Sequence, residues 1–215
     1  KVDQSFVNQM INASALDNGL HAGDLKFVDL DGNNKIEQTT SANDRKDMKV
    51  IGNSLPRYNY NFGISADWYG IDFSVLFQGI GKQNWYPGAE TSMFWGPYSR
   101  PYASFIPSDF MSQVWSEENT NAYFPRPRGY VALGSNRELA VVNTKYLQNL
   151  AYCRLKNLSI GYTLPDKWLS KIGFEKIRVY FSGENLLTFT KLHSDYIDPE
   201  QASASNSWKT SKSDA

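Results

Sequence analysis

A short acidic run has the residue types and the spacing of a calcium-binding loop. Residues 29–37 read Asp-Leu-Asp-Gly-Asn-Asn-Lys-Ile-Glu. Ca²⁺ prefers several oxygen ligands, and loop residues at positions 1, 3, 5 and 7 converge on one point when the chain turns sharply. The residues at those positions are Asp29, Asp31, Asn33 and Lys35, the last through its backbone carbonyl.

Two positions of this run depart from the calcium-loop pattern. Position six is Asn34 instead of Gly, although Asn tolerates a left-handed backbone better than most residues. Position twelve is Thr40 instead of the Glu that supplies the closing bidentate ligand. Two interpretations therefore stay open, a calcium site and an Asx-rich turn without metal.

Aromatic side chains are the second group that could bind a ligand. They make up 14% of the chain. Many of them follow Gly81 in a stretch rich in Pro, Gly and Ser, and the candidates among these are Trp85, Tyr86, Trp95 and Tyr98. Their planes could stack on sugar rings, which makes them candidates for substrate or partner binding. The alternative is that they pack the stretch on itself or against a partner protein.

No other residues suggest a catalytic or nucleic-acid site. Glu117 and Glu118 are adjacent, so they point apart, and nothing supplies the distinct environments of an acid–base pair. Cys153 is the only cysteine, which excludes an internal disulfide or a Cys-based zinc site. The formal net charge is +0, without the basic stripe that nucleic acid requires. We therefore expect a protein that is not an enzyme and does not bind nucleic acid.

The element that precedes the aromatic stretch is a long amphipathic strand. Over residues 57–68 apolar and polar side chains alternate, and the apolar face holds Tyr58, Tyr60, Phe62, Ile64, Ala66 and Trp68. Aromatics at both ends with smaller side chains between them are typical of a lipid-facing barrel strand. About 12 residues, tilted about 45°, span roughly 28 Å, near the roughly 25 Å apolar band of a barrel. A soluble strand is the alternative, but such strands average about 5–6 residues.

Three further strands follow the same pattern. They are predicted at about 71–78, paired with the first through a tight turn at Tyr69-Gly70, at 150–163 and at 177–184. In the third strand Cys153 and Leu155 fall on the opposite parity to Leu158, which predicts either a β-bulge near Lys156 or a strand end that projects beyond the membrane.

The connections between these strands alternate between short and long. Tyr69-Gly70 is tight, and residues 165–173 form a compact link with a helical turn at 166–172. Residues 1–56, 81–148 and 190–215 are long and irregular, as extracellular loops of outer-membrane barrels are. The mean hydropathy of −0.50 does not oppose this, because barrel strands alternate polar with apolar residues. Four strands leave unpaired edges that lipid does not tolerate, so most of the barrel is expected outside this sequence.

Several runs resemble the SusC/RagA family of TonB-dependent transporters. They are Gly23–Gly32, Val50–Tyr58, Leu76–Gly79, Leu155–Pro165 (Leu-Lys-Asn-Leu-Ser-Ile-Gly-Tyr-Thr-Leu-Pro), Arg178–Lys191 and Tyr196–Glu200. They span about residues 23–200 in the family's order. The resemblance implies an all-β fold in which this chain supplies C-terminal strands of a large antiparallel transmembrane β-barrel with long extracellular loops.

The same resemblance implies a function and partners. It predicts an importer of the bacterial outer membrane that moves oligosaccharides or peptides into the periplasm, with a SusD-like surface lipoprotein as lid and TonB as the energy source. Residues 1–56 would form an extracellular segment, and residues 57–215 would form barrel strands and loops, without the plug or the final strand. The family also has an acidic residue soon after Ile36, which an insertion here would displace to Asp44 or Asp47. The alternative function is a secreted all-β carbohydrate-binding or adhesive module.

Overall fold

The computed structural model describes residues 21–39, 41, 43–99, 106–134, 138–171 and 173–202. In chain order the elements are β1 (Asn59–Trp68), β2 (Ile71–Ile80), β3 (Asn84–Trp85), α2 (Ser92–Trp95), the 3-10 turns η1 (Gly96–Tyr98), η3 (Phe110–Gln113) and η4 (Tyr130–Leu133), β4 (Gln148–Asn149), β5 (Tyr152–Thr163), α3 (Asp166–Leu169) and β6 (Arg178–Thr190). Among the described residues, no helix has the length and apolar character needed to cross a membrane.

The chain divides into two compact units. The sheet unit comprises Asn53–Asn84 and Asn149–Leu192. The loop unit comprises the described residues of Lys1–Gly52, Trp85–Gln148 and His193–Ala215. Each unit is therefore built from segments that lie far apart in the sequence.

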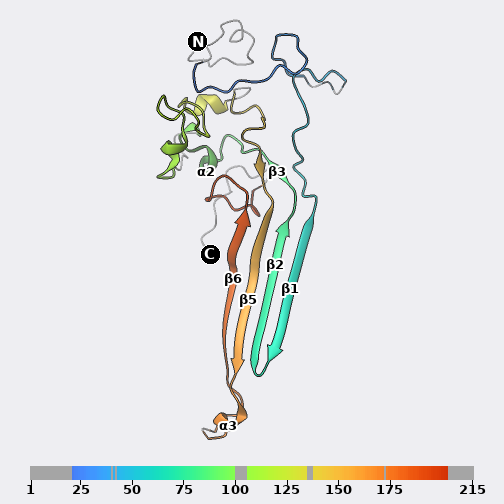
Figure 1. The fold of residues 1–215 in the computed structure, drawn as a ribbon, viewed down its shortest axis with the longest axis vertical. Helices are drawn as coiled ribbons and strands as arrows, with labels where there is room; N and C mark the ends of the chain where they lie inside the picture. The colour runs from blue at the N-terminus through green and yellow to red at the C-terminus, as the bar shows by residue number, and fades with distance from the viewer. Residues whose placement is uncertain are drawn as a thin grey trace. The chain divides into compact units, whose positions relative to one another are not determined.

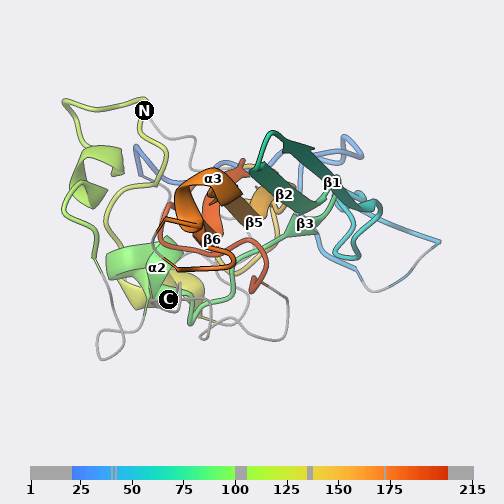
Figure 2. The same cartoon turned by 90° about the horizontal axis from the view of Figure 1, so that it is seen from below.

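The sheet unit is one antiparallel sheet in the order β1-β2-β5-β6. Figure 1 shows these strands side by side, and Figure 2 shows the same order from below. β1 and β2 join through Tyr69 and Gly70, whose φ angles of 47° and 86° are those of a tight type I′ hairpin. The predicted turn is confirmed. The β5–β6 connection also holds the predicted helical turn, although α3 ends at Leu169, before the expected end at Ile172, which lies outside the described residues.

Strand pairing places apolar side chains together on one face of the sheet. In successive rows from the hairpin end, this face carries Trp68, Ile71, Tyr162 and Val179; then Ala66, Phe73, Ile160 and Phe181; then Ile64, Val75, Leu158 and Gly183; and then Phe62, Phe77, Leu155 and Leu187. The face is continuous across all four strands. This is the arrangement of the lipid-facing surface of a barrel wall.

The opposite face of the sheet is polar. One complete row consists of Ser65, Ser74, Ser159 and Ser182, and another consists of Asn61, Gln78, Arg154 and Thr188. Arg154 donates from Nε to the Thr188 hydroxyl at 2.9 Å, so this face also forms hydrogen bonds across strands. A polar face opposite an apolar one is expected of a strand pair that separates lipid from a barrel interior.

The predicted bulge lies at Lys156. The β2–β5 register passes from the Leu76–Asn157 pair to the Phe77–Leu155 pair and leaves Lys156 without a partner on β2. The extra residue reverses the alternation, and Leu155 therefore shares the apolar face with Leu158. β6 follows the irregularity, since Leu155 pairs with Leu187 and Asn157 pairs with Glu184.

Two glycines of the sheet lie beneath side chains that reach across their strand. The Tyr60 hydroxyl on β1 passes over Gly79 on β2 and donates to the Tyr152 carbonyl on β5 at 2.8 Å. On the polar face, Asp72 of β2 binds the Arg178 guanidinium of β6 across Gly161 of β5, with an Nε–Oδ1 distance of 2.9 Å. A methyl group at either glycine would collide with the side chains that cross it.

The loop unit is organised around aromatic rings. The buried aromatic side chains among its described residues are Trp85, Phe94, Trp95, Tyr98, Phe110, Phe124 and Tyr146. Phe110 stacks on Phe124 with 4.7 Å between ring centroids, and Phe94 meets Trp95 edge-on at 4.8 Å. The long segment in which the sequence shows no periodic pattern is thus packed around its own core.

Candidate functional site

The carboxylates of the acidic run converge on one point. One oxygen from each of Asp29, Asp31 and Asp47 lies within 4.8 Å of the other two. Asp47 is held in place because its two oxygens accept hydrogen bonds from the backbone N–H groups of Leu30 at 2.6 Å and Glu37 at 2.7 Å. Of the two acids suggested for the displaced position, Asp47 therefore joins the group.

The other acid, Asp44, has a different partner. Its carboxylate lies 3.3 Å from the Lys46 ammonium, which is also 3.9 Å from Glu37. These contacts hold the pKa of Lys46 above its usual value, mainly through the hydrogen bond and charge of Asp44. Asp44 thus helps to hold the loop and does not join the carboxylate group.

The backbone of the acidic loop turns as a calcium loop does. Asn34 at position six has a φ of 62°, which agrees with the left-handed conformation predicted for it. The N–H groups of Gly32 and Asn34 donate to the Asp29 carboxylate at 2.7 and 2.8 Å. Desolvation raises the pKa of Asp29, but the hydrogen bonds from Asn34 and Gly32 outweigh it and leave the pKa below its usual value. Asp29 is therefore ionised at neutral pH.

Asn33, another predicted ligand, lies beside these carboxylates with its amide nitrogen toward them. The Asn33 side-chain amide donates to Asp31 at 3.1 Å and to Glu37 at 3.0 Å, while its oxygen accepts the Lys35 N–H at 2.8 Å. A cation would require the Asn33 amide to turn its oxygen inward. Position twelve, Thr40, lies outside the described residues.

The four candidate binding aromatics belong mainly to the interior of the loop unit. Trp85, Trp95 and Tyr98 expose 3%, 0% and 1% of their surfaces, and Tyr86 is half-buried. The polar atoms of three of them bind backbone carbonyls: Tyr86 that of Leu139 at 2.7 Å, Trp95 that of Pro87 at 3.1 Å and Tyr98 that of Pro125 at 2.6 Å. This geometry matches the packing alternative, and contact with a substrate or partner stays a prediction.

One histidine takes part in the aromatic core, and sequence reasoning did not find this. The His193 ring stacks on Tyr123 with 3.7 Å between centroids, and its Nε2 lies 2.7 Å from Gln113 Oε1. Burial lowers the pKa of His193, while Asp195 and Asp109 act in the opposite direction. The residues involved are far apart in sequence, so no local spacing could have revealed the cluster.

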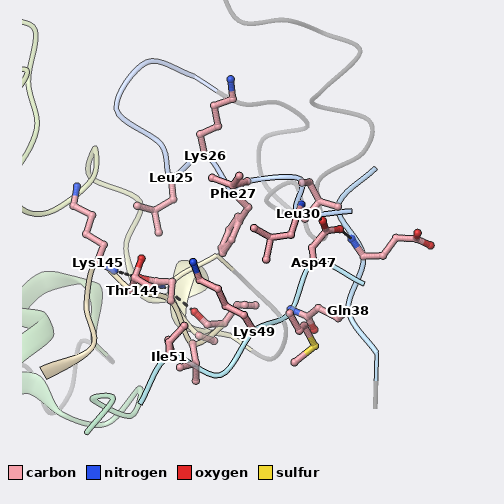
Figure 3. Close-up of a pocket in the computed structure, with 18 residues that line it drawn as sticks. Leu25, Lys26, Phe27, Leu30, Gln38, Asp47, Lys49, Ile51, Thr144 and Lys145 are labelled. Atoms are coloured by element: carbon pink, nitrogen blue, oxygen red, sulfur yellow. Dashed lines mark hydrogen bonds between the residues drawn. The ribbon is translucent and has the colours of Figure 1, made fainter. Parts of the chain in front are cut away.

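A pocket of about 630 Å³ lies behind the acidic loop, and the sequence did not reveal it either. Figure 3 shows Leu25, Phe27, Leu30 and Ile51 around the same space. Other residues between 26 and 49 and residues 140–145 supply the rest of the lining. The pocket is lined by two segments that are far apart in the sequence. Only the apolar residues on both sides of the acidic run were a local sign of part of its lining.

Comparison with known proteins gives sequence relatives. No protein-family model matches the chain. TonB-dependent receptor P3 of Formosa agariphila is 35% identical over 176 residues, which is 81% of this chain and 15% of the relative. TonB-dependent receptor P26 of the same organism is 27% identical over 192 residues, 88% of this chain and 17% of the relative.

Solved structures give the same fold. The RagAB peptide importer in its open-open state matches with a TM-score of 0.52 at 22% identity, over 82% of this chain and 18% of that chain. Its closed-closed state matches with a TM-score of 0.51 at 24% identity and the same coverage. The chain spans less than a fifth of the length of all these proteins. Together with the two-faced antiparallel sheet, the comparisons show that the chain belongs to the SusC/RagA-like TonB-dependent transporters, as a fragment of their β-barrel.

Proposed function

We propose that this chain forms part of the wall and loops of an outer-membrane channel that imports oligosaccharides or peptides into the periplasm. The observation that carries the proposal is the sheet, whose apolar rows on one face oppose polar rows on the other. A wall of this kind satisfies its backbone in lipid only as part of a closed barrel. Family membership favours this function over a secreted carbohydrate-binding or adhesive module.

The proposed partners follow from the same membership. A SusD-like lipoprotein would close over the extracellular side, and TonB would supply energy through parts of the transporter outside this chain. The solved neighbour is described as a peptide importer, which supports peptides as one cargo class. The long loops would face the lid and the cargo, and Tyr86 is the most accessible of the four aromatic candidates for that role.

The test is uptake by the full-length transporter in cells. Deletion of the transporter gene should abolish growth on the imported oligosaccharide or peptide, and the intact gene should restore it. Removal of TonB should abolish uptake as completely. Uptake that continues without either gene product would contradict the proposal.

We further propose that the acidic loop binds Ca²⁺ through Asp29, Asp31 and Asp47. The supporting observation is the convergence of three carboxylates from two separate segments. Asn33 and the Lys35 carbonyl would complete the oxygen set after a turn of the Asn33 amide. The ion would tie residues 29–37 to Asp47 and so stiffen the segment that precedes β1.

Calorimetry on the full-length transporter tests the calcium proposal. Calcium should bind to the wild type and not to the Asp29→Ala/Asp31→Ala variant, and chelation should raise the protease sensitivity of residues 29–56 to that of the variant. Asp44→Ala is the matched control, because Asp44 pairs with Lys46 outside the carboxylate group. Equal calcium binding by all three proteins, or none by the wild type, would show that the loop is an Asx-rich turn.

A further inference from the structure

The pocket behind the acidic loop has the size and walls of a ligand site. Its volume of about 630 Å³ falls within the range of about 300–1,000 Å³ that is usual for such sites. Its lining is largely aliphatic, and Phe27 is the only aromatic residue in it. Val28, Leu30 and Val142 line it while exposing 69%, 45% and 56% of their surfaces, so its apolar wall continues to the outside.

The charges around the pocket are unbalanced. Its carboxylates are already engaged, since Asp47 accepts two backbone hydrogen bonds and Glu37 contacts Lys46 and Asn33. Two of its lysines, Lys49 and Lys145, form no ion pair with any described residue. Lys145 instead lies over the Tyr146 ring at 5.7 Å, and burial lowers its pKa. An incoming carboxylate would restore the balance, because a nearby opposite charge favours the charged form of a lysine.

The two lysines come from the two different segments that line the pocket. Lys49 belongs to the segment that carries Ile51, and Lys145 belongs to the segment that carries Thr144 (Figure 3). A ligand with two carboxylates offers one to each lysine, and apolar groups on it match the aliphatic walls. Sugar rings fit less well, because the lining offers a single aromatic plane.

We propose that this pocket binds cargo peptides in which carboxylate side chains flank apolar ones. The inference rests on the proposed import function and assigns a substrate class to one site of the loop unit. The pocket would hold the peptide by aliphatic contact, while Lys49 and Lys145 pair with its acidic residues. Free fatty acids share the apolar chain and one carboxylate, and their binding is an outcome that the test separates.

The experiment measures binding of short labelled peptides to the full-length transporter in detergent. The probes alternate leucine with aspartate, with lysine or with serine, and a labelled fatty acid is the fourth probe. The Lys49→Gln/Lys145→Gln variant should lose about tenfold in affinity for the leucine–aspartate peptide, since each exposed ion pair contributes a few-fold. The matched control, Arg45→Gln/Lys82→Gln, removes the same charge from exposed residues outside the pocket and should bind as the wild type does.

A charge reversal makes the test independent of folding defects. Lys49→Glu/Lys145→Glu should prefer the leucine–lysine peptide, which the wild type rejects. Equal wild-type affinity for the three peptides, equal losses in the pocket and control variants, or tighter binding of the fatty acid would each overturn the proposal. TonB-dependent uptake of the transporter's own nutrient is measured beside peptide binding. If uptake is intact while peptide binding fails, the peptide proposal is wrong and the import function stands.

Discussion

The crossing of Tyr60 over Gly79 gives the sheet an energetic signature that can be measured. A methyl group at Gly79 would collide with the Tyr152 carbonyl oxygen and would lie 2.5 Å from the Tyr60 hydroxyl. Real side chains do not approach so closely, so Gly79→Ala must displace Tyr60 and separate β2 from β5. Overpacking of this kind costs about 1–3 kcal/mol, and the lost hydrogen bond adds about 0.5–1.5 kcal/mol.

Two further variants separate the free energy of the lost hydrogen bond from that of the overpacking. Tyr60→Phe removes only the hydrogen bond and should cost about 0.5–1.5 kcal/mol. Because Gly79→Ala already breaks that bond, the double variant should fall short of the sum of the single costs by about the same amount. Gly63→Ala is the matched glycine control. A methyl group at Gly63 would have the Val75 carbonyl oxygen as its nearest neighbour, at 3.1 Å.

Urea unfolding of the full-length transporter in detergent, followed by heat-modified gel mobility, measures these free energies. We expect a large loss for Gly79→Ala, a small change for Gly63→Ala and non-additivity with Tyr60→Phe. Equal losses for the two glycine variants, or strict additivity with Tyr60→Phe, would refute the crossing as the reason for glycine at this position.

Three further predictions concern the lipid face, the aromatic core and pH. Ile64→Arg should destabilise the assembled barrel by about 2–4 kcal/mol and Ser65→Arg by much less, and equal effects on unfolding midpoints would reject the register. Trp95→Ala should cost the loop unit about 3–5 kcal/mol, seen as faster proteolysis between residues 85 and 148, whereas exposed Met111→Ala should leave the rate unchanged. Because burial lowers the pKa of His193, its stabilising effect is complete above the unfolded value of about 6.5 and is lost as pH falls through the folded value. Protease sensitivity of residues 193–202 should therefore rise below about pH 6.5 in the wild type, and a His193→Gln variant with the same pH profile would contradict this.

The sheet could be predicted from the sequence because alternation is a local property. Residues 57–68 carry the full two-faced pattern, and the change of parity between Leu155 and Leu158 was enough to locate the bulge at Lys156. The fourth strand is readable from the sequence over residues 177–184, and β6 continues beyond them to Thr190. The irregularity between Glu184 and Leu187 interrupts the alternation there, so the pattern alone stopped too early.

The loop unit could be predicted only in part, because its contacts join distant segments. The acidic run was visible as a local motif, but the choice of Asp47 over Asp44 depends on hydrogen bonds to Leu30 and Glu37 that spacing does not reveal. Trp95 is fully buried by rings from residues 94–146 that follow no period. An aromatic residue in a loop therefore reads equally well as a binding residue or as core until its neighbours are known.

The central claim is that the apolar rows of this sheet face lipid while the polar rows face the barrel interior. Spin labels placed singly from position 153 to position 160 of β5, in full-length transporter reconstituted in lipid, test it most directly. We expect high accessibility to oxygen at positions 155, 158 and 160, high accessibility to a polar nickel reagent at 154, 157 and 159, and a break in alternation at Lys156. Uniform accessibility along the strand, or oxygen accessibility at the serine position 159, would contradict it.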